Sequence, residues 1–302
     1  METATEAELF GPKPGNAGER LAADWRLLLV IGTGLVIQVS HPVIGAGVGA
    51  HSTYRTDPYG RAKRSVWPVL AMVMLEDGGY GADLRAMHRG IGGVDHQGRS
   101  YHAWNAEAAF LVTASAAYAS EQLAARFGTP LTEGERREVF HAWRRAGLSF
   151  GVPEAQVPAD LASFDRWWAD VVDRLEDHPT AHDVLDALRR PKAPSLVPDF
   201  LWWPLGEVVG RVVLLVTLGT LPPVLRERLG YEWREKDERR LRALGRVVRV
   251  VNRVLPRRAR AVNGVLVRRY EKQIRAHAAH GAALGVAPSI AAGGAATVSR
   301  AG

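Results

Sequence analysis

Four histidines lie in the first third of the chain, in or beside short hydrophobic runs: His41, His51, His88 and His96. Ionisable side chains are costly to bury unless they are paired or bound to a ligand. Arginines lie among these histidines, chiefly in the run HPVIGAGVGAHSTYRTDPYGRAKRS, which extends from His41 to Ser65. The combination predicts a binding or catalytic site in this part of the chain.

The chain has 10 histidines and no cysteine, which limits the metal chemistry open to it. Without thiolates there is no disulfide, no cysteine nucleophile, no cysteine-held iron–sulfur cluster and no thiolate-ligated haem. Any metal is therefore held by nitrogen or oxygen. The sequence leaves open a histidine-ligated haem, an iron or zinc site of histidine and carboxylate, or no metal.

His88 is the first candidate for a metal ligand. It lies at the end of a predicted helix over 80–88, and a glycine-rich turn over 90–93 follows it. A single imidazole on a helix is a common axial ligand of haem iron, and small residues let a flat macrocycle approach the backbone. The alternative is a histidine that only binds the last carbonyls of its helix.

The other candidate residues carry weaker signals. His41 could be a second iron ligand, a distal base or a residue that fixes a turn, whereas His51 could bind a cofactor or cap a helix. Arg61, Arg64 and Ser65 share one helical face at i, i+3 and i+4 if a helix begins at Arg61. Such arginines can bind a carboxylate such as a haem propionate, and an ordinary surface ion pair has the same spacing.

Helical periodicity dominates wherever a pattern is legible, so we expect a mainly α fold. A Thr132–Glu135 pair predicts a capped helix that runs to Phe150, and Pro256 ends an amphipathic helix whose apolar stripe includes Leu241, Val248 and Val251. Further helices are expected over 105–127 and 160–176. No run alternates at period two and no strand precedes a glycine fingerprint, which disfavours a nucleotide-binding sheet.

The length of 302 residues allows one large domain or two smaller ones. We expect a flexible segment over 1–23, a helical domain over 24–280 with a possible subdivision at the proline-rich connection 190–204, and a disordered tail over 281–302. The N-terminus has no secretory pattern, so a cytoplasmic location is expected. The apolar runs 27–39 and 212–225 fall short of the roughly 18 to 20 uninterrupted apolar residues that a spanning helix needs.

Positive charge is concentrated near the C-terminus. The chain carries a net charge of +7, but the segment from Arg226 to His280 alone has 17 Lys and Arg against 6 Asp and Glu. Such a segment can attract an anionic membrane surface or nucleic acid. Because its valines and leucines keep a core-facing stripe and no aromatic residues alternate with the arginines, a nucleic-acid platform is disfavoured.

Several spaced motifs resemble those of one oxygenase family, formerly called DUF2236, which includes the latex-clearing rubber oxygenases and a fungal mycophenolic-acid pathway oxygenase. The resemblance covers roughly residues 24 to 255. It rests on His88 and four runs: QVSHPVIGAGVGAHS from Gln38, RTDPYGRAKRS from Arg55, GVDHQGRSYHAWN from Gly93, and FGVPEAQVP from Phe150.

The resemblance implies a single large helical domain with a globin-like core that binds one haem b. In the rubber oxygenases the proximal iron ligand falls on His88 of this chain, and an Arg-x-x-Lys-Thr motif near the haem falls on Arg61, Arg64 and Ser65. A histidine of many relatives is Thr113 here, and an acidic residue that often precedes the His-Ser pair is Ala50. These departures bear on the base of the rubber-cleaving mechanism rather than on haem binding.

The residues and the resemblance together predict a haem-dependent oxygenase. His88 would bind iron, dioxygen would bind the opposite face, and the substrate would be an apolar, unsaturated small molecule or lipid, with Val66, Trp67, Leu70 and Met74 as a pocket lining. The alternative is a non-catalytic helical protein that binds haem or lipid and docks on an anionic membrane through its basic C-terminal region.

Overall fold

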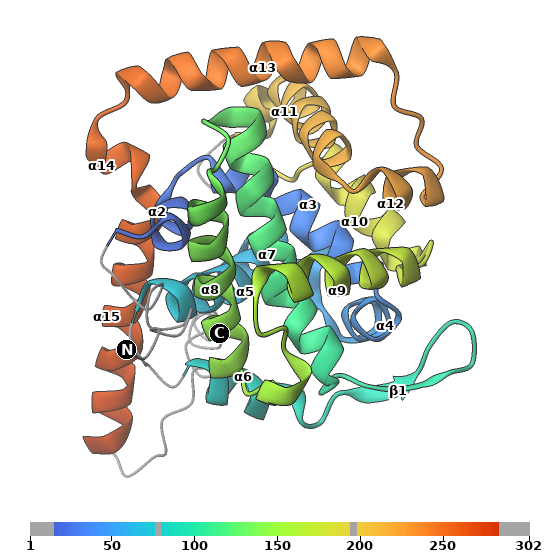
Figure 1. Cartoon of the computed structure of the whole chain (residues 1–302), viewed down its shortest axis with the longest axis vertical. Helices are drawn as coiled ribbons and strands as arrows, with labels where there is room; N and C mark the ends of the chain where they lie inside the picture. The colour runs from blue at the N-terminus through green and yellow to red at the C-terminus, as the bar shows by residue number, and fades with distance from the viewer. Residues whose placement is uncertain (1–14, 76–79, 194–197, 284–302) are drawn as a thin grey trace, which may run out of the picture.

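The computed structural model describes residues 15–75, 80–193 and 198–283, and these residues form a mainly helical fold (Figure 1). The first helices are α2 (Ala17–Ala23), α3 (Leu27–Val39), α4 (Pro42–His51), α5 (Pro58–Met74) and α6 (Tyr80–His88). The central helices are α7 (Ala106–Phe127), α8 (Glu133–Ser149), α9 (Leu161–Arg174) and α10 (Pro179–Arg189). The last are α11 (Asp199–Thr220), α12 (Pro223–Arg228), α13 (Glu235–Val254), α14 (Arg257–Arg260) and α15 (Val262–Ala283). The expected fold class is confirmed.

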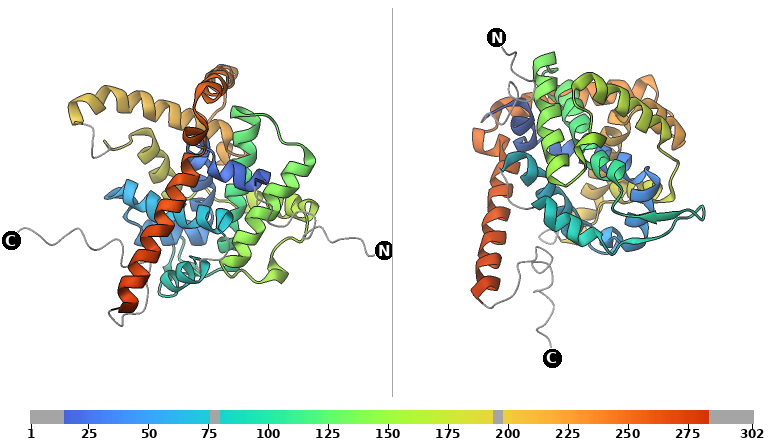
Figure 2. Two further views of the ribbon diagram at one scale, coloured as in Figure 1. Left: turned by 90° about the vertical axis from the view of Figure 1, so that its left-hand side faces the viewer. Right: turned by 60° about the horizontal axis from the view of Figure 1, so that its bottom comes forward.

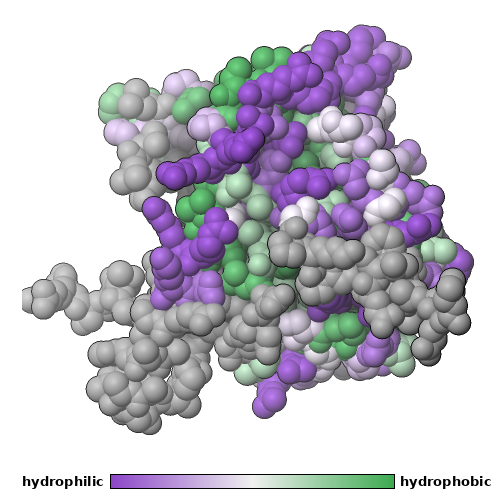
Figure 3. All heavy atoms as spheres, turned by 60° about the vertical axis from the view of Figure 1, so that its left-hand side comes forward, coloured by the Kyte–Doolittle hydropathy of each residue, from purple (hydrophilic) through white to green (hydrophobic). Residues whose placement is uncertain are grey.

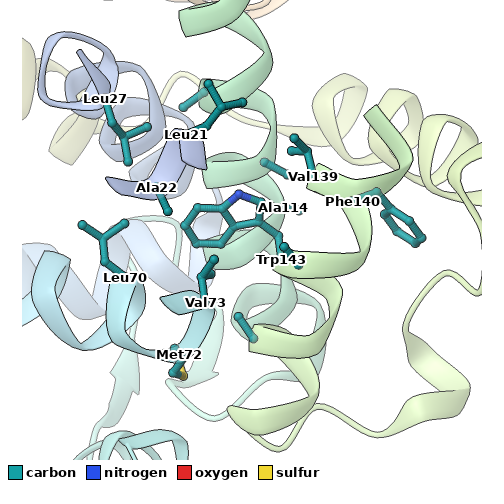
Figure 4. Close-up of a cluster of buried hydrophobic side chains, with 14 of the residues drawn as sticks. Leu21, Ala22, Leu27, Leu70, Met72, Val73, Ala114, Val139, Phe140 and Trp143 are labelled. Atoms are coloured by element: carbon teal, nitrogen blue, oxygen red, sulfur yellow. The ribbon is translucent and has the colours of Figure 1, made fainter. Parts of the chain in front are cut away.

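Helix α7 lies at the centre of the molecule and packs against α3 and α8. One hydrophobic cluster joins α2, α5, α7 and α8, and it encloses the fully buried Trp143 (Figure 4). A second cluster joins α3 to α9, α10 and α12. Burial of this much apolar surface is the main force that holds the helices together.

The local signals for helix ends are confirmed by the structure. Thr132 and Glu135 form a reciprocal capping box at the start of α8, and the side chain of Asn105 caps α7. Helix α6 has the bounds expected from the sequence. The glycines of α4 permit close packing, because a Cβ at Gly45 would lie 2.7 Å from the ring of His178 and one at Gly49 would lie 2.7 Å from Thr180.

Three expectations about boundaries need correction or lie partly outside the described residues. The segment 1–23 is not flexible throughout, because 17–23 form α2 and bury Ala17, Leu21 and Ala22. The proline-rich connection does not extend to 204, because α11 begins at Asp199. The indole N–H of Trp202 in α11 donates to the carbonyl of Pro191 at 2.8 Å. The expected disordered tail over 281–302 is wrong at its start, because α15 extends to Ala283, and the rest of it, 284–302, lies outside the described residues. The subdivision at 190–204 stays a prediction.

Two further expectations concern packing. Val66, Trp67, Leu70 and Met74 belong to the main core or pack against it, and their role as a pocket lining stays a prediction. On α13, Leu241 and Val248 face the core as expected, but Val251 is 39% exposed. The outer face of this helix carries further exposed valines, which the periodicity of the core stripe does not reveal.

A short hairpin follows α6 and is the only sheet among the described residues. Strand β1 (Gly92–Val94) pairs antiparallel with β2 (Ser100–His102), with Gly93 opposite Tyr101. The hairpin projects from the helical body at the lower right of Figure 1. Strands of three residues are too short to show a period-two pattern, which explains why the sequence did not predict them.

None of the described helices combines the length and apolar character needed to cross a membrane alone. Helices α2 and α3 meet those criteria only when they are joined, across a bend of 100° between them.

Candidate functional site

His88 lies at the C-terminal end of α6, and its ring is oriented by its own helix. Nδ1 lies 2.6 Å from the carbonyl oxygen of Leu84, so this nitrogen carries the proton and donates to the carbonyl. The other nitrogen, Nε2, is then left with its lone pair, and it has no hydrogen bond within the described residues. The ring is half-buried and meets Phe150 edge-on at 6.2 Å between centroids.

Helix α6 is held against the end of α8 by two close approaches. A Cβ at Gly81 would lie 1.9 Å from the carbonyl oxygen of Ser149, so only glycine allows this contact. One helical turn later, the guanidinium of Arg85 lies over Gly151, which has a φ of +90°. Together with the buried Leu84, these contacts fix the helix that carries His88.

The chain beyond His88 is braced by residues that sequence reasoning did not select. The ring of His102 uses both nitrogens: Nε2 donates to the carbonyl of Arg89 at 3.1 Å, and Nδ1 accepts from the backbone N–H of Trp104 at 3.1 Å. The indole of Trp104 also meets Phe150 edge-on at 5.4 Å. Phe150 thus meets both the ring of His88 and the indole of Trp104. Aromatic residues are common core residues, so the sequence held no specific signal for this role.

The arginine motif lies at the start of α5. The Nε of Arg61 donates to Ser52 Oγ at 2.9 Å, which links α5 to the end of α4. Ser65 is half-buried on α5, and Arg64 lies in the same helix, although its side chain falls outside the described part of the structure. His51, the residue before Ser52, is exposed at the last position of α4. The structure therefore brings Arg61 and His51 to the same end of α4.

His41 lies at the opposite end of α4, about 15 Å from His51 along the helix axis. It precedes the first helical residue, Pro42, and is only 6% exposed. Its Nε2 lies 3.2 Å from Glu107 Oε1, and Nδ1 is buried with no hydrogen-bond partner in the described chain. Burial lowers the pKa of His41, against the opposing effect of the Glu107 carboxylate.

Glu107 connects His41 to a surface ion-pair chain. It accepts two hydrogen bonds from the guanidinium of Arg174 at 3.0 and 2.8 Å, and Arg174 also pairs with Asp170 at 2.8 Å. The hydrogen bonds from Arg174 hold the pKa of Glu107 below its usual range. His41 is therefore a neutral, enclosed ring that joins α4 to α7 and α9 through Glu107.

A second buried histidine lies close by, under the tip of the hairpin. The ring of His178 is 3% exposed, and His96 from the hairpin packs on it edge-on at 4.6 Å. Arg99 fastens the tip with two hydrogen bonds to Glu176, at 2.6 and 2.8 Å. Burial, and then the neighbouring His96, lower the pKa of His178. Of the four histidines in the first third of the chain, His96 thus has a packing role.

The sequence of the chain matches one protein family over most of its length. The family described as "ER-bound oxygenase mpaB/B'/Rubber oxygenase, catalytic domain" matches residues 19–250. The chain belongs to this family. Membership in this family of oxygenases supports a general oxygenase function for the chain.

Two curated relatives are similar to the chain, and both carry names without a function. They are the uncharacterized protein Mb2261 of Mycobacterium bovis and the uncharacterized protein Rv2237 of Mycobacterium tuberculosis. Each is 28% identical over 243 residues, which cover 77% of this chain and 91% of the relative. No solved structure matches the chain significantly.

The donor set of this oxygenase-family chain fits a haem better than a metal held by protein side chains alone. Within the described residues, no three histidine, aspartate or glutamate side chains come close enough to hold one ion. A haem needs a single axial nitrogen from the protein, because the porphyrin supplies the other four. His88 offers such a nitrogen, since its Nδ1 is already bonded to Leu84. A Cβ at Gly90, two residues after His88, would meet nothing within 4 Å.

Proposed function

We propose that the chain is a haem b-dependent oxygenase that acts on an apolar, unsaturated small molecule or lipid, with His88 as the proximal iron ligand. The observation that carries this proposal is the hydrogen bond from His88 Nδ1 to the carbonyl of Leu84. Such a bond fixes the tautomer with its lone pair on Nε2, keeps the ring from rotating and raises the basicity of the ligand nitrogen.

The residues around His88 suit the side of a flat apolar cofactor. Phe150 lies edge-on beside the ring and packs in turn on Trp104, and the packing of Gly81 on Ser149 prevents α6 from shifting. In the proposed holoenzyme these residues hold the imidazole at a constant angle and exclude water from its buried side. The bound haem supplies the activation of dioxygen.

Arg61, Arg64 and Ser65 are the proposed partners of the haem propionates. Arginine is suited to this role because its planar guanidinium binds a carboxylate through two parallel hydrogen bonds. Arg61 already has one donor, Nε, fixed by Ser52. This bond orients the guanidinium at the end of α4.

His41 has a different role in this proposal. Both of its ring nitrogens lie inside the protein, one on Glu107 and the other enclosed, so a macrocycle has no access to either. His41 therefore positions α4, whose other end carries His51 and Ser52 beside Arg61.

The test is an absorption spectrum of the purified full-length protein after expression with haem supply. We expect a Soret band that shifts when dithionite and carbon monoxide are added, because reduced iron with one protein ligand keeps an open position. His88→Ala should abolish the band. The matched control is His182→Ala. His182 is a partly exposed histidine on α10 that pairs with Asp177, which precedes this helix.

A second measurement separates an enzyme from a haem carrier. Oxygen consumption should rise when terpenoids or unsaturated lipids are added to the haem-loaded protein, and His88→Ala should lose this response. A haem-loaded protein that consumes no oxygen with any of them would support the carrier alternative. A colourless protein that keeps its full activity as His88→Ala would refute the assignment of the iron ligand.

A further inference from the structure

The most basic segment of the chain contains a long stretch of arginines without acidic residues. Between Arg239 and Tyr270 there are 11 arginines and no Asp or Glu. At the start of α13 the arginines are partly paired, as Arg242 is with Glu238 at 3.3 Å. From Arg246 onward none of the described arginines as far as Arg260 has a carboxylate partner. Positive charge therefore accumulates at the C-terminal half of α13 and on α14.

The same half of α13 exposes an apolar stripe. Val247, Val250, Val251 and Val254 follow each other at i, i+3, i+4 and i+7, so they share one face of the helix. Their exposed fractions are 58%, 59%, 39% and 77%. The core face of the helix is a different one, occupied by Leu241, Gly245 and Val248. At 100° per residue, Arg242, Arg246, Arg249 and Arg253 form a row along one edge of the valine stripe. Arg242 pairs with Glu238 and Arg249 donates to the carbonyl of Arg126, whereas Arg246 and Arg253 are exposed and have no carboxylate partner in the described chain.

Helix α11 adds apolar surface next to α13. The two helices are in contact, and the N-terminal half of α11 extends away from the helical body in the left view of Figure 2. Phe200, Leu205 and Val208 on this half are 76%, 50% and 57% exposed. Seven of the 11 large hydrophobic side chains that are exposed in the described chain thus lie on α11 and α13. Figure 3 shows green apolar surface directly beside purple polar surface at the top of the molecule, where these helices lie.

We infer that this face, formed by the outer side of α13, α14 and the N-terminal half of α11, docks on an anionic lipid bilayer. The valine stripe and Phe200 enter the headgroup region while the arginine row binds lipid phosphates. An exposed helix with an apolar stripe beside a row of cations is the pattern that lies in the membrane interface. Each arginine near an anionic surface contributes to the attraction, which adds up over the row.

The charge and shape of this face disfavour the other occupants. A second copy of the chain in a two-fold dimer would place the same patch against itself and bring unneutralised arginines together. Duplex nucleic acid would use the arginines, but its phosphates offer nothing to a stripe of exposed valines. A bilayer uses both features at once. The surface thus has a role independent of the haem site, and it would bring the protein to the phase that holds apolar substrates.

The test measures binding of the full-length protein to vesicles by flotation. We expect binding to phosphatidylcholine vesicles that contain about 30% phosphatidylglycerol and little binding to phosphatidylcholine alone, with release in about 1 M NaCl, where screening is strong. The double variant Arg246→Gln/Arg253→Gln should bind about 20- to 30-fold more weakly, at about five-fold for each lost charge. Its control is Arg166→Gln/Arg189→Gln, which removes two exposed arginines from α9 and α10.

Substitution of the exposed valines distinguishes binding to a bilayer from binding to a nucleic acid. Val250→Gln/Val254→Gln changes only exposed positions and should weaken vesicle binding about 10-fold, because polar side chains lose the gain from entering the interface. The matched control is Val224→Gln on α12, because the side chain of Val224 is also exposed, at 46%. This variant should bind vesicles as the parent does. Unchanged melting temperatures of all variants show that the fold is intact.

Three outcomes would overturn the inference. They are equal binding to neutral and anionic vesicles, vesicle binding that neither double variant weakens, and binding to duplex DNA but not to vesicles. Because none of these measurements uses haem or oxygen consumption, their failure leaves the oxygenase proposal untouched. Conversely, a protein without a Soret band can still pass this test.

Discussion

His88 and His41 lie in two regions of similar composition but opposite organisation. His88 is half-buried at the end of a helix, with one nitrogen bonded to its own backbone and the other without a partner in the described chain. His41 is almost completely buried, with one nitrogen on a carboxylate and the other enclosed. The first arrangement presents a lone pair, and the second fixes a neutral ring inside the fold.

The comparison teaches that burial alone does not identify a ligand. A buried ring can be held in the fold by a hydrogen bond on one side, as His41 is by Glu107, while its other nitrogen is enclosed and out of reach of a ligand. A ligand must instead keep one atom unsatisfied and reachable, while a second bond holds its orientation. By this criterion the less buried histidine is the better candidate, although both occur in similar sequence surroundings.

Removal of each ring in turn tests the different roles of the two histidines most directly. His88→Ala should abolish the Soret band while changing the free energy of unfolding by less than about 1 kcal/mol, because the side chain is half-exposed at a helix end. His41→Asn places a residue type favoured at N-caps at the start of α4 but loses the ring and its contact with Glu107, and it should cost about 1–3 kcal/mol while the folded protein keeps its band. Absorption spectra and urea unfolding measure the two effects. A lost band in His41→Asn would assign His41 to the haem site.

The position of the helix that carries His88 can be tested at Gly81. Gly81→Ala places a methyl group against the carbonyl oxygen of Ser149 and should destabilise the protein by about 1–3 kcal/mol. The shift of α6 should also weaken retention of haem in a transfer assay to apomyoglobin. Gly134→Ala on α8 is the control, because nothing lies within 4 Å of a Cβ there. Equal melting temperatures of the two variants would contradict the close contact.

The carboxylate that holds His41 should matter to stability and not to haem. Glu107→Gln keeps the shape of the side chain but removes the charge that pairs with Arg174, so we expect a loss of about 1 kcal/mol by urea unfolding. The comparison variant is Glu133→Gln, whose ion pair with Arg137 is largely exposed and should contribute almost nothing. A smaller effect at Glu107 than at Glu133 would show that the His41 network is only a surface feature.

The smallest expected effect is a dependence of stability on pH. Burial lowers the pKa values of His41 and His178, so the unfolded chain takes up their protons first as the pH falls below about 6.5. The free energy of unfolding should therefore decrease as the pH falls from 7.5 to 5.5. Thermal melts across this range should show a shallower slope for His41→Asn than for the parent. The slope of His182→Asn serves as the reference, and an identical slope for both variants would exclude His41 as a source.

Much of the fold could be predicted because its signals are local. The capping box at Thr132, the bounds of the helix that ends at His88 and the helix-terminating Pro256 each depend on a few neighbouring residues. The family resemblance rests on motifs of the same kind, and the family match over 19–250 confirms it. His88 could be selected from the sequence because a histidine before a glycine-rich turn is itself a local pattern.

The partners of these residues follow from the packing of the folded chain. The sequence contained His41 and Glu107 but not their contact across 66 positions, and it contained Phe150 without its place beside His88. The valines of α13 follow helical periodicity on two faces, and only packing shows that the face with Val250 is exposed in the described part of the chain. Periodicity and capping depend on neighbours along the chain, whereas burial and pairing depend on the mutual packing of distant segments, which no short stretch of sequence encodes.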